Sequence, residues 1–415
     1  MSCNKQKIEL LAPAGDEEKL RSALHFGADA VYLALERYGL RTASRNFSLA
    51  SLAKALEYAH EREAKVYVTL NILAHETDFD GLAETAKTLE KMGVDAVIVS
   101  DAGVFQVIRE ETSLPIHIST QASLMNARSV QFWGDQGAKR VVLARELSLS
   151  EIGTIRKQID QQLELECFVH GAMCISGSGR CLLSHYMTGR DANRGDCAQA
   201  CRWKYALMEE TRPGEYFPIE EEERGTFIMN SKDLCLLPYL PELLANGIGS
   251  LKIEGRVKSA YYVGTVVHAY RMALDALENG SWSEDLVAYC LKEIQKTSHR
   301  ALTTGFLFGT PGAEGQNYAS TSYIQEYDFV GIVTAVQEEE NTISVEVRNA
   351  FSVGDALEMM TVGKTLFWNV SAIFAENGEA LERAKTPKSI VILPKPGDCS
   401  AGDMVRRAKQ REPEF

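Results

Sequence analysis

Eight short apolar segments, rich in β-branched residues, alternate with helical patterns in the sequence up to Arg256. They begin at Ile8, Ala30, Lys65, Ala96, Ile116, Arg140, Glu164 and Ser250. Nearly continuous apolar runs of this length are typical of strands that are buried on both faces of a parallel sheet. The intervening segments, such as SLASLAKALEYAHER, have apolar residues at helical spacing. This alternation predicts a parallel α/β fold.

The number of strands separates two parallel architectures. Eight strands favour a closed (β/α)8 TIM-like barrel over an open, doubly wound sheet. The open sheet is the alternative, but no G-x-G-x-x-G follows the first strand. The lead-ins GADAVYLAL, GVDAVIVSD and GAKRVVLARE also repeat one junction, in which a glycine ends a helix before the next strand.

Two features set the predicted domain organisation. About 80 residues separate the seventh and eighth strands, far more than a usual βα connection. From about Tyr323 the apolar period changes from 3.6 to 2, in segments such as FVGIVTAV and TISVEVRN, which predicts a small all-β barrel. We therefore expect a barrel domain over 1–300 with a cysteine-rich insertion at about 171–249, a linker over 301–322, and a C-terminal β-barrel domain over 323–415.

Composition excludes several classes of protein. Of 415 residues, 45% are hydrophobic and 24% are charged, which are globular values. The net charge of −13 argues against a general nucleic-acid coat, although a local basic groove remains compatible with it. No run approaches the ~20 apolar residues of a membrane span, and MSCNKQKIELLAP has no apolar signal core. We expect a cytoplasmic protein without a membrane partner.

Cysteines cluster in the predicted insertion. Four of them follow the pattern C-x6-C-x15-C-x3-C, at Cys174, Cys181, Cys197 and Cys201. Four thiolates select zinc or an iron–sulfur cluster. Only Cys197 and Cys201 have the close spacing of structural zinc ligands, so a [4Fe–4S] cluster is favoured over zinc. Metal-free thiols and a ligand role for Cys235 remain alternatives, whereas Cys167 fits a core position.

The same region carries a family resemblance. The stretch from Glu166 to Ser184, with Gly171-Ala172-Met173-Cys174, resembles the signature of the collagenase-like peptidase family, family U thirty-two. LAPAG, GADAVYLAL, STQAS, KIEGR and TTGF, in this order along the chain, are also similar to that family, and so is the C-terminal β-domain. The resemblance covers most of the chain.

The resemblance implies a function beyond the family name. Better-understood members act in oxygen-independent hydroxylation of RNA or of a quinone precursor. The most similar type is implicated in forming 5-hydroxyuridine at the tRNA wobble position, with prephenate as the hydroxyl source. Such members hold an iron–sulfur cluster on four cysteines, which match Cys174, Cys181, Cys197 and Cys201. A paralogous member of the family is a further candidate partner.

The residues themselves give little support for a peptidase. The chain has no H-E-x-x-H, and Ser176-Gly177-Ser178-Gly179 lacks the first glycine of a nucleophile elbow. Cys174 and His170 could form a Cys–His pair, but three further cysteines nearby fit a metal better. A peptidase, or a non-catalytic RNA-binding or assembly factor with a structural cluster, remains an alternative.

Polar residues follow the predicted strands at the end where a barrel places its active site: Asn71, Asp101, Gln121, Arg145, Glu146, His170, Glu254 and Arg256. We expect Arg145, Arg256 and Gln121 to bind substrate, because planar guanidinium groups suit the carboxylates of a small diacid. His170, Glu146 and Glu254 are the candidates for proton transfer. For any one of these residues, a structural salt bridge or cap is the competing interpretation.

Cations and aromatic residues alternate among the cysteines. Tyr186, Trp203 and Tyr205 lie between the candidate RNA-binding residues Arg180, Arg190, Arg194, Arg202 and Lys204. Such a mixture grips phosphate and stacks an unpaired base, although a solvated basic loop looks the same. The basic tail from Arg406 to Arg411 is a second candidate surface. Together with what the family resemblance implies, these observations favour hydroxylation of a tRNA uridine.

Overall fold

The computed structural model describes residues 7–40, 46–174, 180–203, 206–208, 216–218, 232–311 and 323–409. The chain forms two compact units that interleave along the sequence. The first comprises residues 1–20, 28–258 and 299–323, and the second comprises 21–27, 259–298 and 324–415. The sequence analysis divided the chain into consecutive segments with boundaries at about 300 and 323. These boundaries stay predictions.

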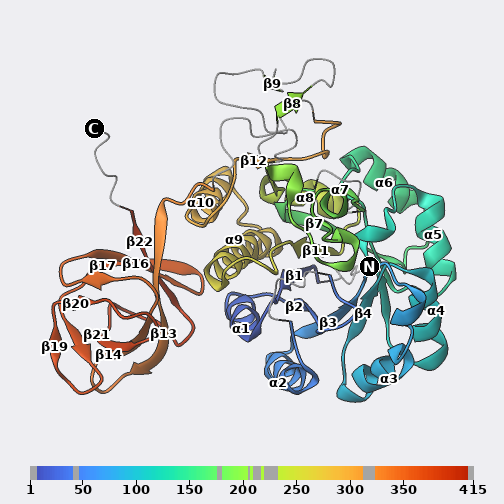
Figure 1. Ribbon diagram of the computed structural model, residues 1–415. Coiled ribbons are helices and arrows are strands. Elements are labelled where there is room, and N and C mark those ends of the chain that lie inside the picture. The colour runs from blue at the N-terminus through green and yellow to red at the C-terminus, as the bar shows by residue number, and fades with distance from the viewer. Residues whose placement is uncertain are drawn as a thin grey trace. The chain divides into compact units, whose positions relative to one another are not determined.

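The first unit is built on a closed parallel barrel, as predicted (Figure 1). Strands β1 to β7 pair in chain order, and β11 closes the barrel by pairing with both β7 and β1. The bounds are β1 Glu9–Pro13, β2 Ala30–Ala34, β3 Lys65–Leu70, β4 Ala96–Val99, β5 Ile116–Ile118, β6 Arg140–Val142, β7 Glu164–Ala172 and β11 Ser250–Ile253. All eight strands predicted from the apolar segments are present.

Helices follow the strands along the chain, and polar side chains cap several of their first turns. They are α1 Glu17–His25, α2 Leu49–His60, α3 Leu82–Met92, α4 Ala102–Glu111, α5 Ala127–Asp135, α6 Leu149–Gln158 and α8 Leu240–Ala245. Asp101, a candidate at the end of β4, accepts hydrogen bonds from the backbone N–H groups of Gly103 and Val104 at the start of α4. It is therefore a helix cap, the competing interpretation for a residue at this position.

The insertion leaves β7 at Ala172 and returns at β11, close to the predicted limits. It contains α7 Leu183–Thr188, β8 Ala206–Met208, β9 Tyr216–Pro218 and β10 Asp233–Cys235. Strand β10 runs antiparallel to the end of β7 and pairs on its other side with β12, Leu302–Thr303. These pairings attach the insertion to the carboxyl ends of the barrel strands.

The second unit combines two helices with an antiparallel sheet. The helices are α9 Ala260–Asn279 and α10 Glu284–Gln295, and no described helix is both long and apolar enough to cross a membrane. The sheet has the order β17-β16-β22-β13-β14-β21-β18-β19, and β15 pairs separately with β20. Its strands are β13 Tyr327–Gln337, β14 Thr342–Val347, β15 Phe351–Ser352, β16 Ala356–Thr361, β17 Lys364–Asn369, β18 Ile373–Ala375, β19 Ala380–Leu381, β20 Arg383–Ala384, β21 Ile390–Pro394 and β22 Met404–Ala408. The predicted all-β domain is confirmed.

A buried arginine corrects the expectation for the basic tail. The guanidinium of Arg406 is fully buried on β22, where it forms ion pairs with Glu293 of α10 and Glu358 of β16. Arg407 pairs with Asp355. Arg406 therefore stabilises the second unit internally and is not available to RNA, while the rest of the tail from residue 410 lies outside the described residues.

Candidate functional site

A cavity of about 230 Å³ opens at the carboxyl ends of the barrel strands. This volume is slightly below the usual range for small-molecule sites, which begins at about 300 Å³. Six of the eight polar residues expected at this end line it together with the four clustered cysteines: Asn71, Gln121, Arg145, Glu146, Glu254, Arg256, Cys174, Cys181, Cys197 and Cys201. The sequence-based choice of this end of the barrel therefore selected residues that share one cavity.

The four cavity cysteines suit a soft metal centre by their chemistry. All four are free thiols and none is buried. The Cys197 sulfur accepts a hydrogen bond from the backbone N–H of Gln199 at 3.4 Å. Among the described residues, no three His, Cys, Asp or Glu side chains are already gathered at metal-binding distance. The donor set fits an iron–sulfur cluster or zinc, and no coordination geometry follows from it.

Three other cysteines of the described chain lie in a different environment. Cys167, Cys235 and Cys290 are buried. Burial raises the pKa of the Cys290 thiol to about 12 and raises that of Cys167 as well. Because a metal ligand must be a thiolate, Cys167 and Cys290 are poor ligands. Cys167 therefore has the core position expected of it.

Arg145 is held at the cavity wall by three neighbours. Its guanidinium lies 3.8 Å from the centre of the Phe168 ring, donates to the carbonyl of Ala172 at 2.7 Å, and approaches the Glu254 carboxylate at 3.7 Å. These contacts connect the ends of β6, β7 and β11. They fix the guanidinium beside the cysteine-rich segment.

Arg256 is buried and is oriented by the β2 and β3 ends. Its guanidinium donates to the carbonyl of Leu40 and to the hydroxyl of Thr69. The Arg256 backbone lies so close to Gly15 that a Cβ there would overlap the Arg256 carbonyl, which explains the glycine in LAPAG.

Gln121 presents an unusual buried acceptor. Its side chain is 7% exposed and lines the cavity, and its Oε1 has no hydrogen-bond partner among the described residues. A buried acceptor without a partner costs about 1–3 kcal/mol. A ligand in the cavity could supply the missing donor. The substrate-binding role of Gln121 stays a prediction.

Replacement of Gln121 by leucine is expected to leave the thermal midpoint unchanged or higher, because an unsatisfied acceptor disappears. If the amide contacts substrate, the same change lowers catalytic activity at least tenfold per folded molecule. Differential scanning fluorimetry and product mass analysis on one preparation measure both quantities. A destabilised variant with normal turnover would show that Gln121 serves the fold.

His170 does not line the cavity, and a β-bulge explains why. Phe168 pairs with Lys252, but His170 pairs with Ile253, so β7 has one extra residue at Val169. Paired residues on neighbouring strands point to the same face, and the bulge turns His170 away from the face of Phe168. Burial lowers the pKa of His170 to about 4, so the ring is neutral at pH 7. Its predicted role in proton transfer stays a prediction.

Lys252 is a cavity residue to which the sequence analysis gave no role. Its side chain is 4% exposed, lines the cavity, and lies in the middle of β11. The sequence signal was present, because a lysine interrupts the otherwise apolar segment SLKIEG. Lysines are almost never fully buried unless they are paired.

The candidate RNA-binding arginines have internal partners. Arg180 donates to the carbonyl of Gln121 at 2.7 Å, and Arg190 pairs with Asp196 at 2.8 Å. Arg194 forms two hydrogen bonds with Asp78, which lowers the pKa of that carboxyl to about 2. The Arg180 and Arg194 contacts fasten the insertion to the barrel loops. The Arg202 side chain and Lys204 lie outside the described residues.

Two aromatic residues of the insertion are exposed to solvent. Tyr186 is 85% exposed and Trp203 is 43% exposed. Leu182 and Met187, beside Tyr186, are exposed as well. Aromatic faces exposed in this way can stack an unpaired base. Tyr205, the third aromatic residue predicted here, lies outside the described residues.

Comparison with protein families decides the classification. The model of Peptidase family U32 matches residues 15–317, and that of the Peptidase family U32 C-terminal domain matches residues 325–406. The chain belongs to Peptidase family U32. The resemblance in the sequence motifs is thereby confirmed.

Three relatives of the chain are named for two different activities, tRNA hydroxylation and collagen cleavage. The chain is 41% identical to tRNA hydroxylation protein P1 of Bacillus subtilis, over 97% of this chain and 96% of the relative. It is 37% identical to tRNA hydroxylation protein P of Escherichia coli, over 94% of each chain. It is 30% identical to a collagenase of Porphyromonas gingivalis, over 79% of this chain and 80% of the relative.

Proposed function

We propose that this U32 protein is an RNA-modifying enzyme that hydroxylates a tRNA uridine, giving 5-hydroxyuridine at the wobble position. Two relatives that match at least 94% of the chain, at 41% and 37% identity, are named as tRNA hydroxylation proteins. One observation about this chain carries the proposal. Four free cysteines, buried cations and an unpartnered amide oxygen share a single cavity at the carboxyl ends of the barrel strands.

Each part of that cavity has a task in the proposal. Cys174, Cys181, Cys197 and Cys201 would hold a [4Fe–4S] cluster, which supplies one-electron transfer when bound. The uridine would leave its stack to reach the cavity, because chemistry on a base needs access to its edge. Exposed Tyr186 and Trp203 would stack neighbouring bases. A small dicarboxylate such as prephenate would occupy the cationic part of the cavity.

The peptidase alternative receives less support from the same cavity. A Cys- or Ser-based hydrolase needs a base within hydrogen-bond reach of its nucleophile. Among the described residues that line the cavity there is no histidine. The family name and the collagenase relative keep hydrolysis as an outcome of the test.

Deletion of the gene in its host is expected to remove 5-hydroxyuridine and its derivatives from digested tRNA, as measured by liquid chromatography and mass spectrometry. Expression of the wild-type chain should restore them. The Cys174→Ala chain, present in equal amount, should not. Unchanged nucleosides in the deletion strain would contradict the proposal. Cleavage of gelatin by the purified protein would instead favour the peptidase.

A further inference from the structure

Lys252 lies at the inner end of the cavity, among buried residues. Its ammonium is 4.6 Å from the centre of the Tyr32 ring and 5.5 Å from that of Phe168, and all three residues line the cavity. The side chains of Tyr32, Phe168 and Lys252 are each less than 9% exposed. The two rings stabilise a cation and exclude water from this end.

The ammonium group of Lys252 has more hydrogen-bond donors than its contacts with the described residues require. An ammonium group has three donors. Among the described residues, one contact uses them, at 2.8 Å to Oε1 of Glu166. Arg145 and Arg256 donate to backbone carbonyls of this chain, which fixes their orientation. Lys252 is a buried cation that lines the cavity and has donor capacity to offer a ligand.

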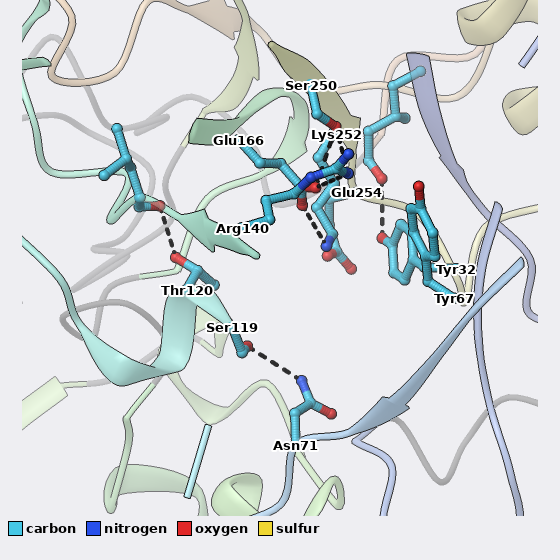
Figure 2. Close-up of polar contacts among 12 residues, drawn as sticks. Tyr32, Tyr67, Asn71, Ser119, Thr120, Arg140, Glu166, Ser250, Lys252 and Glu254 are labelled. Atoms are coloured by element: carbon cyan, nitrogen blue, oxygen red, sulfur yellow. Dashed lines mark hydrogen bonds and ion pairs between the residues drawn. The ribbon is translucent and has the colours of Figure 1, made fainter. Parts of the chain in front are cut away.

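A buried network below the cavity positions Lys252 through its ion pair with Glu166. Glu166 also accepts from Arg140 at 3.0 Å and from Ser250 at 3.2 Å, and Arg140 pairs further with Glu9. Figure 2 shows the side chains of Arg140, Glu166, Ser250 and Lys252 converging in the barrel. Burial by itself would raise the pKa of the Glu166 carboxyl, but Lys252 and Arg140 outweigh it and the pKa is lowered. The carboxylate that orients Lys252 is thus ionised at neutral pH.

The charged side chains around the cavity favour an anionic ligand. The charged side chains that line it are Arg145, Lys252, Arg256, Lys258, Glu146 and Glu254. Cations outnumber carboxylates by two among these side chains, before the four cysteines add negative charge as metal ligands. A low-dielectric wall strengthens this attraction relative to water.

We infer that Lys252 binds one carboxylate group of a small dicarboxylate co-substrate at the inner end of the cavity. Glu166 is its positioning residue. The inference rests on the proposed function, because it assigns a binding place to the proposed hydroxyl donor. It also orders the site, since the co-substrate lies deeper and the uridine lies nearer the exposed aromatic residues.

Isothermal titration of the full-length protein with prephenate, without tRNA, tests the inference apart from hydroxylation. Lys252→Met is expected to weaken binding at least tenfold, because a buried charged hydrogen bond is lost. Phenylpyruvate, which has one carboxylate, serves as a second probe and should bind the wild-type protein more weakly than prephenate.

Two further variants make the result decisive. The double variant Lys252→Met with Glu166→Gln removes the ion pair as a unit and leaves Arg140 paired with Glu9, so it should fold and still bind prephenate weakly. Lys65→Met, an exposed lysine at the start of β3, should bind as the wild type does.

The outcomes separate the inference from the proposed function. Wild-type affinity in both Lys252 variants would overturn the inference while leaving hydroxylation intact. Failure of the wild type to bind prephenate would overturn it together with the dicarboxylate donor, and the nucleoside analysis would still decide hydroxylation. Weak binding in both variants, with thermal midpoints near wild type, supports it.

Discussion

Replacement of any one of Cys174, Cys181, Cys197 and Cys201 by alanine is expected to remove most bound iron and to abolish 5-hydroxyuridine formation. The four thiols line one cavity, and a [4Fe–4S] cluster is generally held by four cysteines. Anaerobic purification, iron analysis and visible absorption measure the loss. The thermal midpoint of each variant reports whether the barrel still folds.

Cys167→Ala and Cys290→Ala are the matched controls, because both thiols are buried and both have raised pKa values. They should keep full iron content, with a modest loss of stability from the smaller side chain. Zinc in place of iron in the wild-type protein would contradict the cluster. Full iron content in all four single variants would contradict the ligand assignment.

Replacement of Arg140 by methionine is expected to lower the free energy of unfolding by about 3–5 kcal/mol, the usual effect of removing one partner from a buried ion pair. Arg140 is 4% exposed and forms ion pairs with Glu9, Glu164 and Glu166. Its loss leaves the buried carboxylates of Glu9 and Glu166 with less compensation. Denaturant unfolding at pH 7 measures the change.

The pH dependence of that change follows from two carboxyl groups. Against the opposing effect of burial, Arg140 and hydrogen bonds lower the pKa of Glu9 below 4.5, and Lys252 and Arg140 lower that of Glu166. Groups with a lowered folded-state pKa contribute stability above pH 4.5 and lose it as the pH falls through the folded value. The gap between wild type and Arg140→Met should therefore narrow on acidification.

A surface arginine provides the comparison for Arg140. Arg62→Met removes a half-exposed ion pair with Glu61 and should change the free energy of unfolding by less than about 0.5 kcal/mol. Equal effects at Arg140 and Arg62 would show that the buried network contributes nothing to stability. A gap between wild type and Arg140→Met that stays constant with pH would show that Glu9 and Glu166 are not its partners in solution.

Local pattern was sufficient for the fold class. An apolar, β-branched segment that is buried on both faces looks alike wherever it lies in a parallel barrel, so all eight strands could be predicted. The end of the barrel that holds the site followed from chain direction, because parallel strands present their carboxyl ends together. That rule placed Gln121, Arg145, Glu146, Glu254 and Arg256 around one cavity.

Strand register could not be predicted in the same way. The sequence places His170 two residues after Phe168, which in a regular strand would give both the same face. One extra residue in β7 reverses this and removes His170 from the cavity. The bulge depends on how β7 pairs with β11, about 80 residues later in the chain. The residues of β7 alone therefore do not predict it.

The sequence by itself was sufficient to predict the barrel, the all-β domain, the family and the four cysteines that line the cavity. The tertiary structure decided which charged side chains form ion pairs within the protein and which have hydrogen-bond donors left for a ligand. Arg194 pairs with Asp78, Arg406 is buried against Glu293, and Lys252 keeps unused donors at the inner end of the cavity. The physical reason is that ion pairs and burial join residues far apart in the chain, whereas propensity and periodicity act between neighbours.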